Sequence, residues 1–308
     1  MPHIRLVFMG TPEFAVPSLE CLLANDYEVA AVVTAPDKPQ GRGKRVVPSP
    51  IKVAARAYKL PVLQPTDLKA PSFLATLQSY QATLQVVVAF RMLPQVVWAM
   101  PAIGTFNLHA SLLPAYRGAA PINWAIMNGE QETGVTTFFV AQAMDTGPIL
   151  LQEKEPIYTT DTAGTLYERL KHKGAQLVLK TVQAIAQGHY TATPQAPTPA
   201  RLDKKAPKIY KEDCQINWHQ DAVAILNFIR GLSPYPAAWT ILNGSNYKIL
   251  SAAKATEVLP HLNPSEPYSD GKQYVCIGTQ NDPVAIKVLQ LAGKKPMTVQ
   301  AFLRGHQI

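Results

Sequence analysis

Short apolar stretches alternate with helix-like stretches through the first half of the chain. Buried strands are expected at three apolar runs, which span residues 4–10, 28–35 and 84–90. Helices are expected at three segments with helical spacing or a proline boundary, which span residues 12–24, 51–59 and 71–80. Because alternating strands and helices form βαβ units, this pattern predicts a doubly wound, mostly parallel α/β sheet of the Rossmann-like type. Ligands of such sheets bind beyond the carboxyl ends of the strands.

The chain changes character near residue 190. Before it, residues 135–140 and 149–157 are strand-like, and residues 162–188 have the pattern of a long amphipathic helix. Asp161 is the expected N-cap of this helix, and Gly188 is its expected end. The residues that follow are rich in Pro, Thr and Ala and have no periodicity, which indicates an extended linker.

The last third of the chain combines one short helix, at residues 221–231, with several short strands. Turn signals separate these strands at Asn243–Gly244, Asp270–Gly271 and residues 280–283. This pattern suits a small, OB-like β-barrel. We therefore expect a catalytic domain at residues 1–189, a linker at 190–207 and a C-terminal barrel domain at 208–308.

Composition narrows the class of protein. The 308 residues are 47% hydrophobic and 16% charged, which is typical of a globular chain long enough for two domains. The three cysteines are scattered and form no CxxC motif, which fits a reducing compartment and disfavours a disulfide framework or a zinc knuckle. We see no signal peptide and no apolar run of about 18 residues, so we expect a cytoplasmic protein without a membrane partner. The net charge of +8 favours an anionic partner such as nucleic acid, although many basic proteins bind none.

Candidate chemistry begins in residues 105–110, where polar and apolar side chains alternate. In an extended strand Asn107 and His109 point to the same face, about 7 Å apart. The imidazole can accept a proton near neutral pH, and the amide can donate to a developing oxyanion. The alternative is a structural histidine beside a turn-forming asparagine, and for a bare Asn-x-His pattern that alternative is the stronger.

Asp145 lies in a loop between two strand-like runs, where its carboxylate could orient His109 or stabilise its charge. The Asp145–Gly147 sequence also occurs in aspartic proteases, but those need two such motifs and an all-β pattern. Ser111 near His109 could suggest a serine hydrolase, yet no GxSxG motif surrounds it. Neither protease class is therefore favoured.

Together these motifs resemble the folate-dependent formyltransferases. The resemblance rests on Asn107-x-His109, the Ser111–Pro114 turn, Arg117–Gly118, Pro121–Trp124 and Asp145–Gly147, and it extends over the whole chain. Residues 208–218 and 230–239 also match the entry into the second domain of family members that act on a tRNA. The resemblance implies that Asn107, His109 and Asp145 are catalytic. It also implies that a turn borders the folate site, formed by Ser111, Leu112, Leu113 and Pro114.

The activity implied by the resemblance is transfer of a formyl group from 10-formyltetrahydrofolate to the amino group of initiator methionyl-tRNA. The C-terminal domain would help to hold the tRNA, and we expect a monomer. No metal is implied, since the seven histidines are dispersed and no HExxH is present. Nor is NAD implied, because the sequence after Gly10 lacks the GxGxxG fingerprint.

A basic segment follows the second expected strand. Residues 37–52 contain the single acid Asp37 and five cations, which are Lys38, Arg42, Lys44, Arg45 and Lys52. Its glycines and prolines exclude a regular helix, so we interpret it as a mobile basic loop. In relatives that act on tRNA this loop contacts the acceptor stem. The resemblance therefore implies tRNA contacts by Lys38, Arg42, Lys44 and Arg45, with Arg42 foremost.

Two departures and three alternatives accompany the resemblance. Phe90–Arg91 stands where the family usually has Tyr-Gly, which leaves the pterin contacts open, and Ala120 stands where a proline is common. The nearest alternative is the same chemistry with a small acceptor, such as glycinamide ribonucleotide or an amino sugar. The others are a hydrolase of 10-formyltetrahydrofolate and an RNA-binding module with a vestigial α/β domain. Retention of the three candidate catalytic residues argues against the last.

Overall fold

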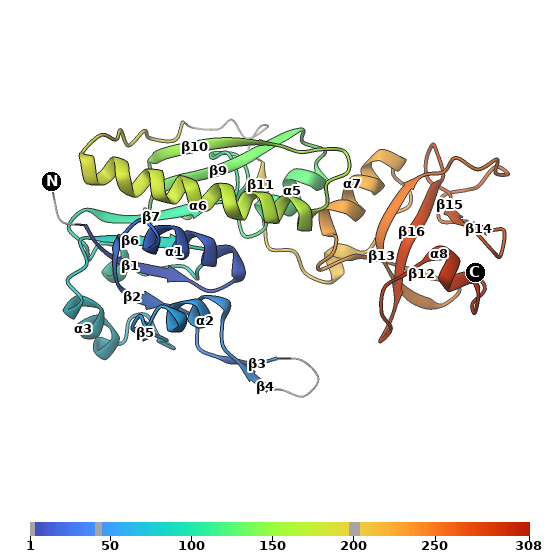
Figure 1. The fold of residues 1–308 in the computed structure, drawn as a ribbon. Helices are drawn as coiled ribbons and strands as arrows, with labels where there is room; N and C mark the ends of the chain where they lie inside the picture. Colours follow the sequence, from blue (N-terminus) through green and yellow to red (C-terminus); the bar gives the residue numbers. More distant parts are fainter. Residues whose placement is uncertain (1–3, 41–44, 197–203) are drawn as a thin grey trace. The chain divides into compact units, whose positions relative to one another are not determined.

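The first half of the chain forms a central sheet of seven strands: β1 (Arg5–Gly10), β2 (Glu28–Val33), β5 (Val62–Leu63), β6 (Leu84–Val88), β7 (Gly104–His109), β9 (Glu132–Phe139) and β10 (Ile149–Pro156). In the computed structural model, which describes residues 4–40, 45–196 and 204–308, their order is β10-β9-β7-β6-β1-β2-β5 (Figure 1). The pairs β1–β2, β1–β6, β2–β5 and β6–β7 are parallel, and β9 is antiparallel to β7. The predicted mostly parallel sheet is therefore confirmed.

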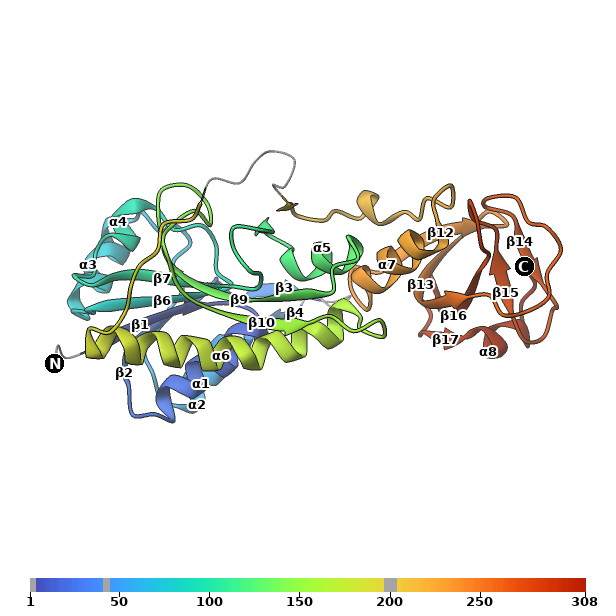
Figure 2. The same cartoon turned by 90° about the horizontal axis from the view of Figure 1, so that it is seen from above.

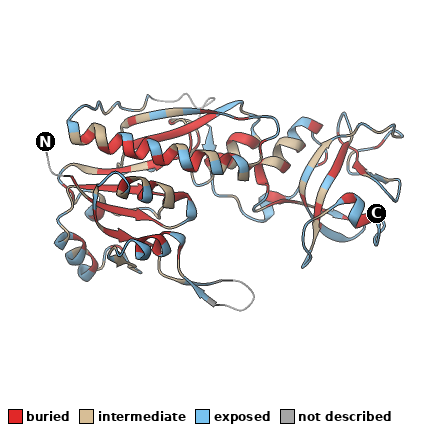
Figure 3. Cartoon of the chain, viewed as in Figure 1, coloured by how far each residue is buried: buried red, intermediate tan, exposed pale blue. Residues whose placement is uncertain are grey.

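Helices cover both faces of this sheet: α1 (Val16–Leu23), α2 (Pro50–Ala57) and α6 (Ala163–Gln187) on one, α3 (Pro71–Ser79) and α4 (Gln95–Trp98) on the other (Figures 1 and 2). Under α3, its Phe73 and Leu77 pack against Val7 and Met9 of β1 in one buried cluster. On the opposite face, a Cβ at Gly174 of α6 would lie only 2.7 Å from Leu108 Cδ2. This glycine therefore lets α6 approach β7 closely. The strands between these helices are largely buried (Figure 3).

The long helix α6 begins one residue later than expected. Thr165 N–H donates to Thr162 Oγ1 at 3.2 Å, so Thr162 is the N-cap, and the expectation of Asp161 is wrong by one position. Asp161 instead accepts the Tyr158 N–H at 2.8 Å in the preceding turn. At the other end Gly188 has φ +70°, a conformation that favours glycine, which confirms the expected stop.

Residues 37–52 are more regular than the expected loop. Strands β3 (Lys38–Gln40) and β4 (Arg45–Val47) form an antiparallel hairpin in which Lys38 faces Val47 and Pro39 faces Val46. Valines favour extended backbone, and each strand is three residues long. Helix α2 then begins at Pro50, with Ser49 as its N-cap. The interpretation of this whole segment as an irregular loop is therefore corrected.

The chain divides into two compact units by its internal contacts. One comprises Met1–Gly118, Gly134–Glu155 and Glu168–Lys204; the other comprises Ala119–Thr133, Pro156–Tyr167 and Lys205–Ile308. Each contains its own buried core. The second unit thus includes two short segments that lie, in the sequence, between stretches of the first unit. No helix in the described residues is long and apolar enough to cross a membrane.

The second unit is built on an antiparallel sheet of six strands: β12 (Ala238–Leu242), β13 (Ser245–Lys254), β14 (Pro267–Ser269), β15 (Val275–Ile277), β16 (Val284–Leu291) and β17 (Met297–Thr298). The order is β12-β13-β16-β15-β14, with β17 beside β16. Since β12 and β14 do not pair with each other in residues 204–308, the sheet is open, and the expected closed barrel is not confirmed. Beside it, helix α5 (Pro121–Met127) packs on helix α7 (Ala222–Leu232).

Close packing joins α5 and α7. A Cβ at Gly231 would lie 2.5 Å from Met127 Cγ and 3.1 Å from the Asn123 carbonyl oxygen, so only glycine fits there. The Asn123 amide donates to the Gly231 carbonyl at 2.8 Å. The remaining short elements are β8 (Arg117–Gly118), β11 (Lys205–Ala206), α8 (Val299–Leu303) and the 3-10 turns η1 (Glu13–Ala15) and η3 (Glu212–Cys214).

Candidate active site

Strand β7 carries Asn107 and His109 to the carboxyl end of the sheet. Its neighbours fix the register, because Asn107 pairs with Val87 on β6 and with Phe138 on β9. Asn107 is half-buried, and its carboxamide makes no hydrogen bond to any described residue. His109 is buried, with 6% of its surface exposed. Because Asn107 and His109 are two positions apart in this strand, they lie on the same face of β7, which is what the alternation predicted.

The tautomer of His109 follows from its main-chain partner. Its Nε2 lies 2.8 Å from the carbonyl oxygen of Tyr116. Since a carbonyl oxygen only accepts hydrogen bonds, Nε2 carries the proton, and Nδ1 is the basic nitrogen of the neutral ring. Tyr116 is buried at φ +61°, and its N–H donates to the Lys204 carbonyl at 2.5 Å. These contacts hold the carbonyl group against the imidazole.

Asp145 lies on the other side of the imidazole. Its Oδ2 is 3.9 Å from His109 Nδ1, and it accepts the Gly118 N–H at 3.0 Å. The 3.9 Å separation is too long for a hydrogen bond but short enough for charge stabilisation of a protonated ring. Asp145 has φ +55°, which is uncommon for a residue other than glycine. The structure thus brings Asn107, His109 and Asp145 together in one unit.

Arg117 and Gln195 hold the main chain of the Asp145 loop. Arg117 Nε donates to the Asp145 carbonyl at 3.1 Å, and Gln195 Nε2 donates to the carbonyls of Asp145 and Gly147, both at 2.8 Å. Gly147 is required by space, because a Cβ there would lie 1.7 Å from the Phe139 carbonyl oxygen. No sequence pattern indicated this role for Gln195, because it lies in the expected linker, where the residues show no periodicity.

The Ser111–Pro114 turn is built into the protein interior. Ser111 is fully buried, and its hydroxyl donates to the Ala115 carbonyl at 2.7 Å. Thr136 Oγ1 donates to the Ser111 carbonyl at 2.6 Å and accepts the Leu113 N–H at 3.2 Å. Leu113 is also buried, whereas Leu112 and Pro114 are half-buried. Of these four residues, Leu112 and Pro114 thus retain the more accessible side chains.

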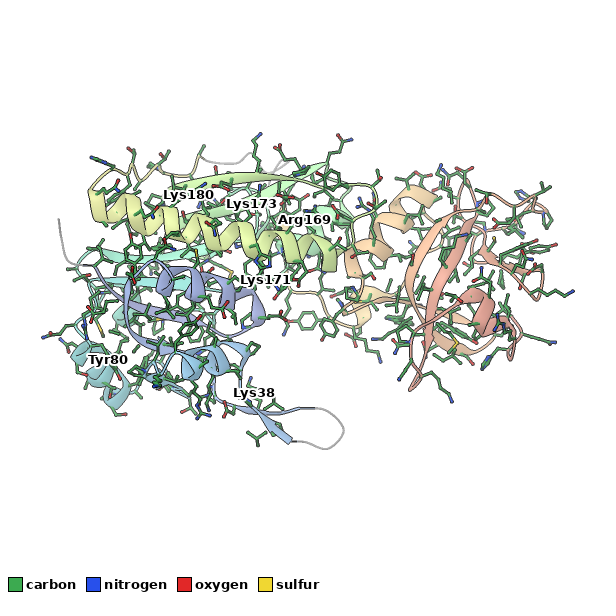
Figure 4. All side chains as sticks on the ribbon, viewed as in Figure 1. Lys38, Tyr80, Arg169, Lys171, Lys173 and Lys180 are labelled. Carbon is green, nitrogen blue, oxygen red and sulfur yellow. The ribbon has the colours of Figure 1, made fainter. Side chains whose placement is uncertain are left out.

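The basic residues of the hairpin divide into two groups. Lys38 is exposed on β3 (Figure 4), whereas Arg42 and Lys44 lie outside the described residues, and for Arg45 the backbone alone is described. Lys52 is buried on α2, and its Nζ donates to Asp37 Oδ2 and Gln64 Oε1, both at 2.5 Å. The hydrogen bonds from Lys52 and Gln64 hold the pKa of Asp37 below its usual value. Lys52 is therefore an internal anchor and not a cation of a free loop.

Arg91, the departure near the expected pterin pocket, turns inward. Its Nη1 donates to the Thr66 carbonyl at 2.9 Å, and its Nη2 donates to the Pro65 carbonyl. Its guanidinium also lies 5.6 Å from the centre of the Phe90 ring. Arg91 thus ties the loop after β6 to the loop after β5.

The cations of α6 are largely neutralised by acids. Arg169 Nε and Lys173 Nζ each lie 2.8 Å from a carboxylate oxygen of Glu155 on β10, and Lys180 Nζ lies 2.6 Å from Glu153 (Figure 4). Burial would raise the pKa of Glu155, but hydrogen bonds from Lys173 and Arg169 outweigh it and keep the pKa low. This face of α6 is therefore a network of ion pairs and not an unopposed positive surface.

Comparison with known proteins shows the family of this chain. Residues 4–182 match a family described as "Formyl transferase", and residues 208–307 match "Formyl transferase, C-terminal domain". The chain is 46% identical to methionyl-tRNA formyltransferase of Bacteroides fragilis, over 99% of this chain and 96% of that protein.

Solved structures show the same fold. The crystal structure of HypX from Aquifex aeolicus in complex with tetrahydrofolic acid has a TM-score of 0.65 at 21% identity, covering 97% of this chain. This chain spans 46% of HypX. The structure of WlaRD, a sugar 3N-formyl transferase, in the presence of dTDP and 5-N-formyl-THF has a TM-score of 0.67 at 22% identity, covering 96% of this chain and all of that one.

Proposed function

The chain belongs to the formyl transferase family, and on that premise we propose that it transfers a formyl group from 10-formyltetrahydrofolate to the free amino group of initiator methionyl-tRNA. The product is N-formylmethionyl-tRNA, which serves translation initiation. The observation that supports this acceptor most directly is the 46% identity to a methionyl-tRNA formyltransferase along nearly the whole length of both chains. The protein is thus a one-carbon group transferase.

Asn107 is the proposed oxyanion donor. 10-Formyltetrahydrofolate supplies a formyl group activated on N10, and negative charge develops on the formyl oxygen as the amine adds to its carbon. The carboxamide of Asn107 suits this role because it is half-buried and makes no hydrogen bond to the described protein. A preorganised donor costs no reorganisation when that charge forms.

His109 is the proposed base for the attacking amine. Its Nε2–H is engaged by Tyr116, so Nδ1 is the nitrogen that can take up the amine proton. Asp145, 3.9 Å from Nδ1, stabilises the imidazolium that results. As the bond between N10 and the formyl carbon breaks, N10 gains a proton through water and the imidazolium gives up the proton it took from the amine, so the reaction balances and His109 returns to its neutral form.

The binding surfaces are proposed from the resemblance together with accessibility. We assign the folate border to residues 111–114 and the tRNA contacts to Lys38, Arg42, Lys44 and Arg45. Exposure of Lys38 is compatible with a phosphate contact. We further propose domain boundaries at 1–189, 190–207 and 208–308, with the C-terminal sheet as an OB-like tRNA-holding module. A cytoplasmic monomer completes the proposal.

One assay tests the function and its nearest alternatives. Purified protein receives 10-formyltetrahydrofolate labelled in the formyl group together with charged initiator tRNA, glycinamide ribonucleotide or water alone. We expect label on the tRNA, and loss of that transfer in His109→Ala. Label on the small acceptor, or release as formate, would reject the proposed acceptor. Near-normal turnover of a folded His109→Ala variant would reject the assignment of the site.

A further inference from the structure

The amide of Gln195 is fully engaged around the Asp145 loop. Its Nε2 donates to the carbonyl oxygens of Asp145 and Gly147, both at 2.8 Å. Its Oε1 accepts from Arg117 Nε at 3.1 Å and from Arg117 Nη2 at 2.5 Å. A primary amide has two donors and two acceptor sites, so every hydrogen-bonding position of this side chain is occupied.

Gln195 reaches the loop because its own segment is fixed. Thr193 and Ile149, at the start of β10, exchange two backbone hydrogen bonds of 2.7 and 2.8 Å. Two residues later, Gln195 is half-buried. The Tyr190 ring, just before this segment, also packs edge-on against Phe139 at 6.0 Å between ring centres. The residues leading into Gln195 are thus attached to the sheet edge.

The Asp145 loop requires such support. A non-glycine residue at φ +55° is in an uncommon conformation that persists when surrounding contacts determine it. Arg117 contacts the same carbonyl of Asp145, but Arg117 is itself held by Gln195 Oε1. Gln195 and Arg117 together form a clamp on the main chain of the Asp145 loop. Gln195 is its central residue, because it contacts both the loop and Arg117, and the clamp fixes the position of the Asp145 carboxylate relative to His109.

We propose that Gln195 is a positioning residue for formyl transfer, which acts through Asp145 and touches no substrate. This inference rests on the proposed function, and within it on Asp145 as the partner of His109. Its consequence is kinetic, because displacement of a catalytic group by about 1 Å can lower a rate on the order of a hundredfold without weakening substrate binding.

The test replaces Gln195 by Met, which keeps length but cannot hydrogen-bond in the same way. In the full chain we expect kcat to fall about ten- to a hundredfold, with KM for both substrates within about twofold of wild type. Gln195→Glu keeps the acceptors for Arg117 but has no N–H for the two carbonyls, so kcat should also fall. Thr193→Ala is the matched control, because Thr193 is exposed and its bridge uses backbone groups.

A double-mutant cycle with Asp145→Asn separates positioning from general damage. If Gln195 acts through Asp145, Gln195→Met should lower kcat by less than about twofold in the Asp145→Asn background. Equal losses in both backgrounds, normal kcat in both Gln195 variants, or a change in KM alone would overturn the inference.

Amide hydrogen exchange provides a readout that does not depend on activity. The Gly118 N–H, which donates to Asp145 Oδ2, should exchange faster in Gln195→Met than in Thr193→Ala. Equal exchange in the two variants would contradict the clamp even if activity fell. If the wild-type chain formylates no acceptor, the proposed function fails, while this measurement still decides whether Gln195 holds the loop.

Discussion

The two N–H donors of the Asn107 carboxamide form no hydrogen bond with any described residue. Asn107→Ala should therefore leave the fold intact and lower kcat by about 10²–10³, because one preorganised oxyanion donor is lost. Steady-state kinetics with both substrates, alongside thermal unfolding, measure the two effects. Gln78→Ala, which removes an exposed carboxamide from α3, is the control and should behave as wild type. A reduced Tm together with normal kcat would make Asn107 a structural residue.

Lys52 contributes to stability through Asp37. Because the pKa of Asp37 is lowered by Lys52 and Gln64, this contribution is complete above the ordinary pKa of 3.8 and is lost as pH falls through the lowered value. Lys52→Met should lower Tm at neutral pH, and the difference from wild type should shrink below about pH 4. Thermal unfolding from about pH 7 to 2.5 checks this, with exposed Lys69→Met as the control. A difference in Tm that does not change with pH would exclude the ion pair as its source.

Single residues could be placed from the sequence where polar and apolar side chains alternate regularly. The alternation in residues 105–110 predicted that Asn107 and His109 share a face. It could not reveal Tyr116 as the partner of His109, because that contact uses a carbonyl group that every residue has. Nor could it reveal Gln195, since the contact joins residues 50 positions apart and its segment has no periodicity.

At the scale of elements, the β9–β10 connection depends on the absence of a side chain at Gly147. Gly147→Ala should lower the free energy of unfolding by about 3 kcal/mol and reduce kcat, because the new Cβ would displace the Phe139 carbonyl 1.7 Å away. Urea unfolding and kinetics measure both. Gly305→Ala, where a Cβ meets nothing within 4 Å, should change neither. Full stability of Gly147→Ala would mean that the loop relaxes freely.

Element prediction failed where elements are short. Strands β3 and β4 are three residues each, too few to show an alternation, and the prolines and glycines between strand and helix favoured a loop. In contrast, β6 is five buried residues, all apolar except Gln85, and was recognised directly. Long periodic segments such as α6 were predicted to within one residue at each end.

At the scale of the whole molecule, the net charge of +8 suits a polyanionic acceptor. Arg42→Ala should lower kcat/KM for tRNA and reduce the salt dependence of that value, since one phosphate contact lowers the slope by about 1. The KM for 10-formyltetrahydrofolate should not change. Kinetics over a range of salt concentration, with Lys69→Ala as a charge-matched control, decide the matter. An unchanged salt slope would remove Arg42 from the tRNA surface.

The organisation of the whole chain was only partly accessible from sequence. Composition marked the change near residue 190, and the family matches leave residues 183–207 between them. The packing of α5 on α7 was not accessible, because it joins segments about 100 residues apart through Gly231, which has no side chain. Such contacts depend on shape, which composition does not encode.

The hydrogen bond from His109 Nε2–H is accepted by the main-chain carbonyl oxygen of Tyr116. Alanine scanning replaces side chains and leaves every carbonyl group in place, so a scan through this segment would score position 116 by its ring alone. Glycine accepts φ +61° without strain and should keep the contact, whereas a β-branched residue resists that conformation. Tolerance at this position should therefore follow backbone preference and the fit of a buried side chain, and not the ability of that side chain to form hydrogen bonds.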